Sequence, residues 1–159
     1  MRYVLPAALS ALFIFALVVS FYTPASGPST LPNSFTVHNT TFNVSSYALT
    51  QQQREQGLMN ATITNQTFML FVFYNSSIYP FWMKNTYSPL DIIWIEAENG
   101  TGRIVYAVNA TPCVSYDPNQ TSCLVYYPKS DANYVIETKS GFMQRNNISI
   151  GDPIVLNSP

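Results

Sequence analysis

Apolar and polar positions follow short, strand-like patterns along most of this 159-residue chain. Alternation over 35–39 and 41–45 predicts two strands that form a hairpin around Asn39 and Thr40, because successive side chains of a strand point to opposite faces. The uninterrupted apolar run over 67–74 predicts a buried strand. One further strand is expected to start at the dipeptide Tyr79-Pro80. Others are expected over 90–96, 103–109, 124–127, 132–138 and 154–156.

Two segments carry helix signals instead. Thr50 with Gln53 forms a capping-box pattern and Gly57 is a helix stop, so a short helix is expected over 51–56. Residues 140–145 are expected to form a helical turn. Six or more short strands with one or two short helices predict a mainly-β fold, a small barrel or a sandwich with α+β character. No internal repeat and no second domain is indicated.

The amino-terminal segment, residues 1–22, is apolar from Val4 to Tyr22 behind one basic residue, Arg2. This length predicts a single transmembrane anchor whose amino terminus stays in the cytoplasm. A cleaved signal peptide that ends near Ala25 is the alternative. Both interpretations export the rest of the chain: a Pro/Gly/Ser-rich linker over 23–34 and an extracytoplasmic domain over 35–159. We therefore expect a single-pass protein of the cell membrane with its carboxy-terminal domain outside.

Composition supports this location. Charged residues make up 9% of the chain, against roughly 25% in average soluble proteins, and the net charge is −1. Nucleic-acid binding is excluded because it requires clustered Lys and Arg. A random arrangement of the Asn, Ser and Thr residues would give about 2.6 Asn-X-Ser/Thr motifs, yet the chain has nine. N-linked glycans are expected at Asn39, Asn43, Asn60, Asn65, Asn75, Asn99, Asn109, Asn119 and Asn147. An unmodified, Asn-rich polar surface is the alternative.

The two cysteines, Cys113 and Cys123, lie close together in sequence. In an exported domain they predict one disulfide that closes a short loop. A zinc site is disfavoured because two Cys and the single His38 do not complete a tetrahedral ligand set. Methionines 59, 69, 83 and 143 would suit copper, but such residues usually fill gaps in an apolar core. No metal and no cofactor is expected.

A block of polar residues from Trp82 to Asp91 interrupts the apolar pattern and is the candidate site. It is either a turn whose polar groups define the fold or a pocket for a small ligand or glycan, lined by Trp82, Lys84, Asn85 and Asp91. Catalysis has weak support, since His38 is the only histidine that could act as a general base and the chain has no Gly-x-Ser-x-Gly motif to present a nucleophile. Asp91 and Glu137 could act together as a general acid and base, although nothing in their sequence spacing shows that they meet.

The blocks Arg54-Glu55-Gln56-Gly57-Leu58-Met59, Met69 to Phe73, Phe81 to Thr86 and Pro89 to Ile92 occur in an order that resembles the family called domain of unknown function 192. The tail, with Tyr134 to Glu137 and Ile150-Gly151-Asp152, fits as well, so the resemblance covers about residues 35–157. It implies a compact β-rich fold with a short helix, in small bacterial or archaeal domains that often follow a signal peptide or anchor. It implies no reaction.

The disulfide loop, the many glycosylation motifs and the low charge depart from the usual pattern of that family, and we interpret them as adaptation to an archaeal cell exterior. The leading functional hypothesis is an accessory subunit or interaction module of a membrane or cell-surface assembly, with other membrane proteins as partners. A small-ligand or metal-binding module is the second hypothesis, and an enzyme is the third.

Overall fold

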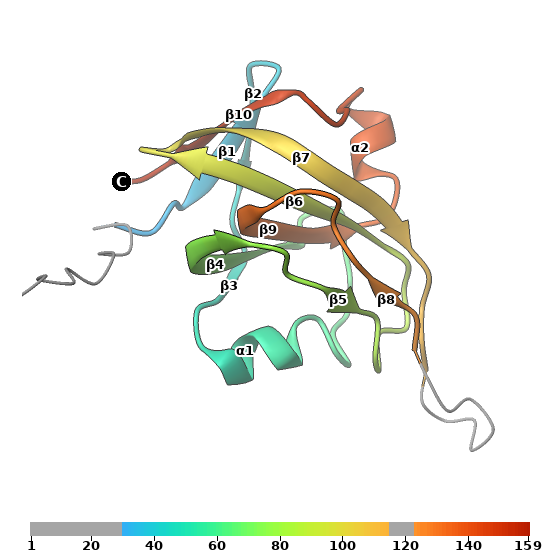
Figure 1. The fold of residues 1–159 in the computed structure, drawn as a ribbon. Coiled ribbons are helices and arrows are strands. Elements are labelled where there is room, and N and C mark those ends of the chain that lie inside the picture. The colour runs from blue at the N-terminus through green and yellow to red at the C-terminus, as the bar shows by residue number, and fades with distance from the viewer. Residues whose placement is uncertain (1–29, 115–122) are drawn as a thin grey trace, which may run out of the picture.

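The computed structural model describes residues 30–114 and 123–159. Eight strands form one curved, half-barrel sheet in the order β2-β1-β10-β7-β6-β9-β4-β3, and β5 pairs with β8 in a separate two-stranded ribbon (Figure 1). The prediction of a mainly-β fold with one or two short helices is therefore confirmed, and two helices are present in the described residues. The strands of the large sheet are β1 (Ser34–Val37), β2 (Thr40–Asn43), β3 (Ser46–Ala48), β4 (Phe68–Ser77), β6 (Leu90–Glu98), β7 (Thr101–Ala110), β9 (Ala132–Lys139) and β10 (Pro153–Asn157). The ribbon consists of β5 (Phe81–Trp82) and β8 (Val125–Tyr126), and the helices are α1 (Gln51–Gln56) and α2 (Phe142–Arg145).

Helix α1 begins and ends where its sequence signals predict. The Thr50 side chain accepts a hydrogen bond from the backbone N–H of Gln53, and the Gln53 side chain accepts one from the backbone N–H of Thr50. Gly57 ends the helix with a positive φ of 46°, and its N–H donates to the carbonyl oxygen of Gln53 at 2.9 Å. Only a residue without a Cβ adopts this backbone conformation at little cost.

The predicted amino-terminal hairpin forms with its turn one residue earlier than expected. Val37 pairs with Thr40, so His38 and Asn39 are the two turn residues, and both have positive φ. This turn geometry matches the right-handed twist of the flanking strands. Strand β3 was not predicted, because its three residues are too few to show a periodic pattern. It pairs in parallel with β4 through Tyr47 and Leu70.

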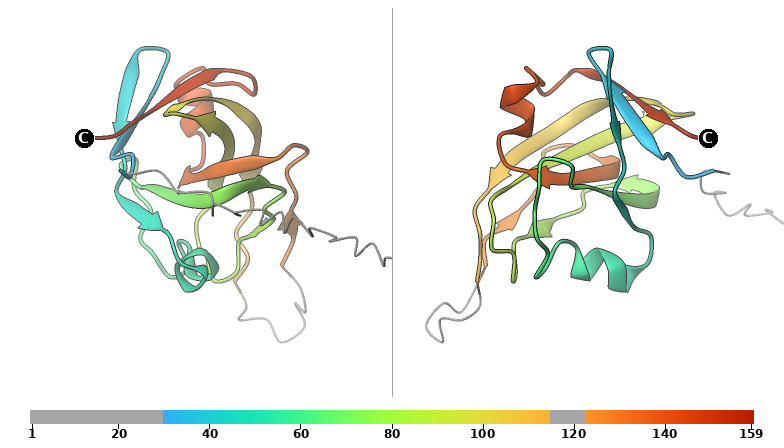
Figure 2. Two further views of the ribbon diagram at one scale, coloured as in Figure 1. Left: turned by 60° about the vertical axis from the view of Figure 1, so that its left-hand side comes forward. Right: turned by 180° about the vertical axis from the view of Figure 1, so that it is seen from behind.

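Both faces of the central strands are buried, which explains the uninterrupted apolar runs in β4 and β6. On one face Leu70, Ile93 and Ile136 pack in a core that also contains Phe142 of α2, which we call the α2-side core. On the other face Phe71 and Trp94 belong to a second core that also contains Leu58, Phe81 and Met83, which we call the α1-side core. In both views of Figure 2, α1 lies at the opposite end of the molecule from the β1–β2 hairpin.

Asp91 attaches α2 to the sheet. Its Oδ1 accepts hydrogen bonds from the Asn109 side-chain amide at 2.8 Å and from the Gly141 backbone N–H at 3.2 Å. Its Oδ2 accepts one from the Met143 backbone N–H at 2.9 Å. These bonds hold α2 where the Phe142 ring packs edge-on against Phe68, with ring centroids 5.1 Å apart.

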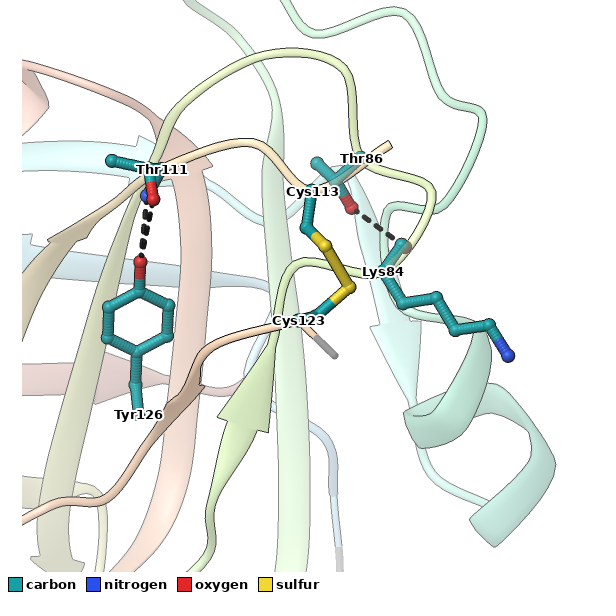
Figure 3. The surroundings of a disulfide bond; sticks show 6 residues. All are labelled: Lys84, Thr86, Thr111, Cys113, Cys123 and Tyr126. Atoms are coloured by element: carbon teal, nitrogen blue, oxygen red, sulfur yellow. Dashed lines mark hydrogen bonds between the residues drawn. A yellow bond between two sulfur atoms is a disulfide. The ribbon is translucent and has the colours of Figure 1, made fainter. Parts of the chain in front are cut away.

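The β5–β8 ribbon is fastened to the sheet at two points. The predicted disulfide joins Cys113, just beyond β7, to Cys123, just before β8. Cys113 also makes isolated bridges with Lys84 and Thr86, which follow β5 (Figure 3). Two residues before β5, the carbonyl oxygen of Tyr79 accepts a hydrogen bond from the Trp94 indole N–H at 2.8 Å. The ribbon is therefore held against the face of the sheet that carries the α1-side core.

Within residues 30–114 and 123–159, no helix has the length and apolar character needed to cross a bilayer. The expected anchor over 1–22, most of the expected linker over 23–34 and the glycosylation motif at Asn119 lie outside the described residues.

Candidate functional site

A cavity of about 210 Å³ opens between α1, the segment that forms β5, and the central strand β9. It is smaller than the roughly 300–1,000 Å³ typical of pockets for drug-sized ligands, so its size suits a smaller molecule. Its lining contains four ionisable side chains and a group of aromatic rings. The lining residues are Gln51, Arg54, Glu55, Gln56, Gly57, Leu58, Met59, Phe73, Tyr79, Pro80, Phe81, Trp82, Lys84, Thr86 and Glu137.

Glu137 is the buried polar group of this cavity. It lies on β9 between Met69 of β4 and Ile92 of β6, and only 4% of its surface is exposed. Burial raises the pKa of its carboxyl group from an ordinary value of 4.5 to about 8, although a hydrogen bond with the Leu58 backbone acts in the opposite direction. The carboxyl group is therefore mainly protonated and neutral at pH 7.

One oxygen of this carboxyl group, Oε2, has no hydrogen-bond partner among the described residues. Gly57 lies directly beside it, and a Cβ atom at that position would come within 3.3 Å of Oε2. An unpaired buried polar atom is unusual, because its desolvation costs about 1–3 kcal/mol without compensation. A cavity that adjoins such an atom gives a ligand a polar group to satisfy.

Aromatic rings form the walls. Phe73 and Tyr79 stack with ring centroids 3.6 Å apart, and Phe81 packs edge-on against Trp94 of β6 at 5.5 Å. Trp82 follows Phe81 in the chain but points the other way and remains 42% exposed. Successive residues of a strand point to opposite sides, so the short β5 contributes one ring to the core and one to the surface.

The two cationic side chains of the cavity, Arg54 and Lys84, differ in the groups that they contact. Arg54 directs Nη1 to the carbonyl oxygens of Leu49 at 2.6 Å and Val72 at 3.3 Å, and its guanidinium lies 5.1 Å from the centre of the Phe73 ring. Lys84 places Nζ 5.2 Å from the centre of the Trp82 ring. Within the described residues, neither cation forms an ion pair with a carboxylate.

The four residues predicted from the Trp82–Asp91 block separate into three places. Trp82 and Lys84 line the cavity, together with Thr86. Asn85 belongs to a turn with a positive φ of 53°, where its carbonyl oxygen accepts a hydrogen bond from the Asn60 N–H at 2.9 Å. Asp91 lies outside the cavity and holds α2.

The hypothetical acid pair of Asp91 with Glu137 does not form. Asp91 pairs with Thr138 across β6 and β9, whereas Glu137 pairs with Ile92. Because paired residues of an antiparallel ladder point to the same face and neighbours along a strand to opposite faces, the two carboxyl groups lie on opposite sides of the sheet. The sequence does contain a signal for Glu137: it is the single acid of β9, and it lies on the same strand face as the apolar Val135.

The four methionines that would suit copper do not gather at one site. Met69 and Met83 fill the α1-side core, Met59 lines the cavity, and Met143 packs against the α2-side core. Within the described part of the chain, no group of three or more His, Cys, Asp or Glu side chains is arranged to hold a metal.

Known proteins resemble this chain in sequence and fold. A family model named DUF192, "Uncharacterized ACR", matches residues 33–156. A crystal structure from Sinorhizobium meliloti, of a protein proposed to be a transcription regulator, is 29% identical with a TM-score of 0.61, and the match covers 76% of this chain and 88% of that chain. A protein of unknown function from Novosphingobium aromaticivorans is 25% identical, also with a TM-score of 0.61, over 82% and 94% of the two chains. No curated protein matches the chain.

Proposed function

The chain belongs to the DUF192 family, and on this premise we propose that it is a binding domain whose ligand enters the cavity lined by Trp82, Lys84 and Glu137. The ligand is a small molecule, as the size of the cavity requires. The domain acts by binding, and we assign no reaction to it.

The observation that carries this proposal is the buried carboxyl group of Glu137 with its unpartnered Oε2. A side chain that served stability alone would be better replaced by an apolar residue of similar shape, because a buried polar group without a partner destabilises the folded state. Gly57 and the aromatic walls place this group at the edge of a cavity rather than in a closed core. A perturbed titratable group in a concave site is a general mark of binding and active sites.

The test is a binding screen on the full-length protein in mild detergent, monitored by saturation-transfer NMR and by tryptophan fluorescence. The panel contains small carboxylates, amides, amines and monosaccharides. At least one class is expected to bind saturably and to change the fluorescence, because Trp82 lines the cavity and is exposed. Glu137→Met, which removes the hydrogen-bonding group and keeps a side chain of similar length, is expected to weaken that binding at least tenfold.

The matched control is Glu98→Met, which makes the same chemical change at an exposed acid outside the cavity. It is expected to leave binding unchanged. Absence of saturable binding across all classes would overturn the proposed function, as would equal binding to the wild type and to Glu137→Met.

A second function has support from the surface: a membrane-anchored, N-glycosylated extracytoplasmic interaction module. All eight glycosylation-motif asparagines within the described residues are exposed, as glycan attachment requires. Apolar side chains at Leu124, Val125 and Tyr127 are also exposed on and beside β8, where a partner protein would find apolar surface. Four of the eight asparagines, at 39, 60, 99 and 147, have positive φ, so turn formation also explains their presence.

Mass spectrometry of the protein purified from its native membranes tests this second function. Export predicts glycan mass on several of these asparagines and a partner that remains bound in mild detergent. An unmodified, monomeric protein recovered from the soluble fraction would contradict it. The role proposed for the Sinorhizobium protein is not extended to this chain, whose seven Lys and Arg residues and net charge of −1 do not suit DNA.

A further inference from the structure

The chemical class of the ligand follows from how the charges in the cavity are used. Four ionisable acids and bases line it: Arg54, Glu55, Lys84 and Glu137. Glu55 accepts a hydrogen bond from the Gln51 side-chain amide at 2.9 Å, and Arg54 directs Nη1 to two backbone carbonyl oxygens. Lys84 makes no ion pair within the described residues. With Glu137 protonated, two cations and one carboxylate remain, so the cavity carries a net positive charge.

The geometry points to a small organic acid as the ligand: we propose that its carboxylate binds at Lys84 and that a hydroxyl or carbonyl oxygen at its other end accepts a hydrogen bond from Glu137. This inference rests on the proposed function of the cavity as a ligand site. It adds the sign of the ligand's charge and the polar group at each end.

The part of the cavity beside Glu137 favours a ligand atom that accepts a hydrogen bond. The buried carboxyl group accepts from the Leu58 backbone and has no partner at Oε2, so in its neutral form it has an O–H to donate. Within the described residues nothing accepts that hydrogen bond. A ligand hydroxyl or carbonyl oxygen would satisfy it, whereas an ammonium group has no lone pair that could accept the hydrogen bond.

The part of the cavity beside Lys84 favours an anionic group of the ligand. Lys84 lies on the Trp82 ring, and a cation held by an aromatic face keeps its N–H groups available for an anion. Its backbone is fixed by the isolated bridge to Cys113, whose disulfide bond holds the start of the β8 segment. Figure 3 shows the Lys84 side chain extending away from the disulfide bond.

The middle of the ligand is flat or apolar. The stacked pair of Phe73 and Tyr79 and the ring of Phe81 line the space between α1 and β5. Rings of this kind pack well against a planar or aliphatic body and offer it few hydrogen bonds. A highly charged ligand such as a free polyphosphate would find one ammonium group without an ion pair, an Arg54 that is bound to backbone carbonyls, and two acidic side chains.

A matched set of probes tests the inference on the full-length protein in mild detergent. The probes are 4-hydroxybenzoate, its neutral amide 4-hydroxybenzamide, the cation 4-hydroxybenzylamine, and benzoate, which lacks the hydroxyl group. The expected order is that 4-hydroxybenzoate binds at least tenfold more tightly than the amide and the amine, and several-fold more tightly than benzoate.

Two variants assign the two ends. Lys84→Met is expected to remove the preference for the carboxylate over the amide, while Lys129→Met, which removes an exposed lysine outside the cavity, retains it. Glu137→Met is expected to remove the preference for 4-hydroxybenzoate over benzoate. Circular dichroism confirms that each variant is folded.

The outcomes distinguish the assignment of an organic acid from the broader proposal that the cavity binds a ligand. Equal or tighter binding of the amide or the amine would overturn the organic-acid assignment and leave the cavity as a ligand site. A carboxylate preference that persists in Lys84→Met would also overturn the assignment. If no probe of any charge binds, the organic-acid assignment fails, and the proposed function fails with it only when the wider panel of carboxylates, amides, amines and monosaccharides also shows no binding.

Discussion

Glu137 and Asp91 are acids with almost the same exposure, 4% each, and opposite roles. Asp91 accepts three hydrogen bonds, two of them from backbone N–H groups around the start of α2. Glu137 has an oxygen without any partner and borders a cavity. The number of hydrogen bonds, rather than burial, therefore distinguishes a structural acid from a candidate binding acid.

Replacement of Glu137 by Gln is expected to remove a pH dependence of stability. The pKa of Glu137 is about 8 in the folded state and near 4.5 when the side chain is exposed. The folded state therefore holds a proton that the unfolded chain releases, so this contribution to stability is full below pH 4.5 and is lost as the pH rises to about 8. At about 1.36 kcal/mol per pH unit, the loss is on the order of 5 kcal/mol.

Urea unfolding of the wild type and of Glu137→Gln from pH 4.5 to pH 9 measures this effect. The difference in unfolding free energy between the two proteins should change across this range in favour of the variant. Glu98→Gln, at an exposed position, serves as the control and should follow the wild type. Parallel pH profiles for the wild type and Glu137→Gln would show that the carboxyl group is not protonated by burial.

Replacement of Asp91 by Asn is expected to destabilise the fold and to spare the cavity. An amide has one acceptor oxygen, so it cannot reproduce all three bonds that Asn109, Gly141 and Met143 donate. Hydrogen bonds to a charged group contribute about 1.5–3 kcal/mol each, so we expect a loss of roughly 2–4 kcal/mol in urea unfolding. Ligand binding below the unfolding transition should be unchanged, and a loss of binding without a loss of stability would contradict this assignment.

Among the elements, the β5–β8 ribbon matters most for the cavity. It consists of two pairs, Phe81 with Tyr126 and Trp82 with Val125. Two-residue strands are too short to be stable without support. The support comes from the disulfide bond, from the bridges of Cys113 to Lys84 and Thr86, and from the hydrogen bonds of the Thr111 N–H and hydroxyl groups with the Tyr126 hydroxyl (Figure 3).

Loss of the disulfide bond in Cys113→Ser/Cys123→Ser is expected to lower stability and loosen this wall of the cavity. The two cysteines are 10 residues apart, for which the loop-closure model gives roughly 2.5–3 kcal/mol. Urea unfolding measures the loss. Quenching of Trp82 fluorescence by iodide should also increase, and unchanged quenching would indicate that the remaining contacts hold β5 by themselves.

At the scale of the whole molecule, β10 joins the two parts of the sheet. It pairs with β1 on one side and with β7 on the other, so the β1–β2 hairpin reaches the rest of the sheet through it. Ile154 and Leu156 also place their side chains in the α2-side core. A segment near the end of the chain thus completes a sheet that begins near residue 34.

Deletion of residues 153–159 is therefore expected to abolish cooperative unfolding of the domain, because it leaves β1 and β7 without their shared partner and opens the α2-side core. Thermal denaturation followed by circular dichroism measures this loss. Deletion of only residues 158–159, which lie beyond β10, is the control and should leave the transition intact. A sharp transition in the longer deletion would mean that β6, β7, β9 and β4 form a stable unit alone.

Local signals determined the elements of this protein. The capping box at Thr50 and Gln53 set the start of α1, Gly57 set its end, and the Asn99-Gly100 turn joined β6 to β7, because each feature depends on backbone geometry over a few residues. The disulfide bond was predictable from two cysteines near each other. The family could be identified from short blocks in order, and the match over residues 33–156 confirms it.

The tertiary structure alone decided which polar residues meet. Trp82 and Lys84 are near Asp91 in sequence, yet they share a cavity with Glu137, which is more than fifty residues away, while Asp91 faces α2. That division depends on strand register: Asp91 pairs with Thr138 and Ile92 with Glu137, and a shift by one residue would exchange the faces. Register is set by pairing between distant strands, and the pattern within one strand does not contain it.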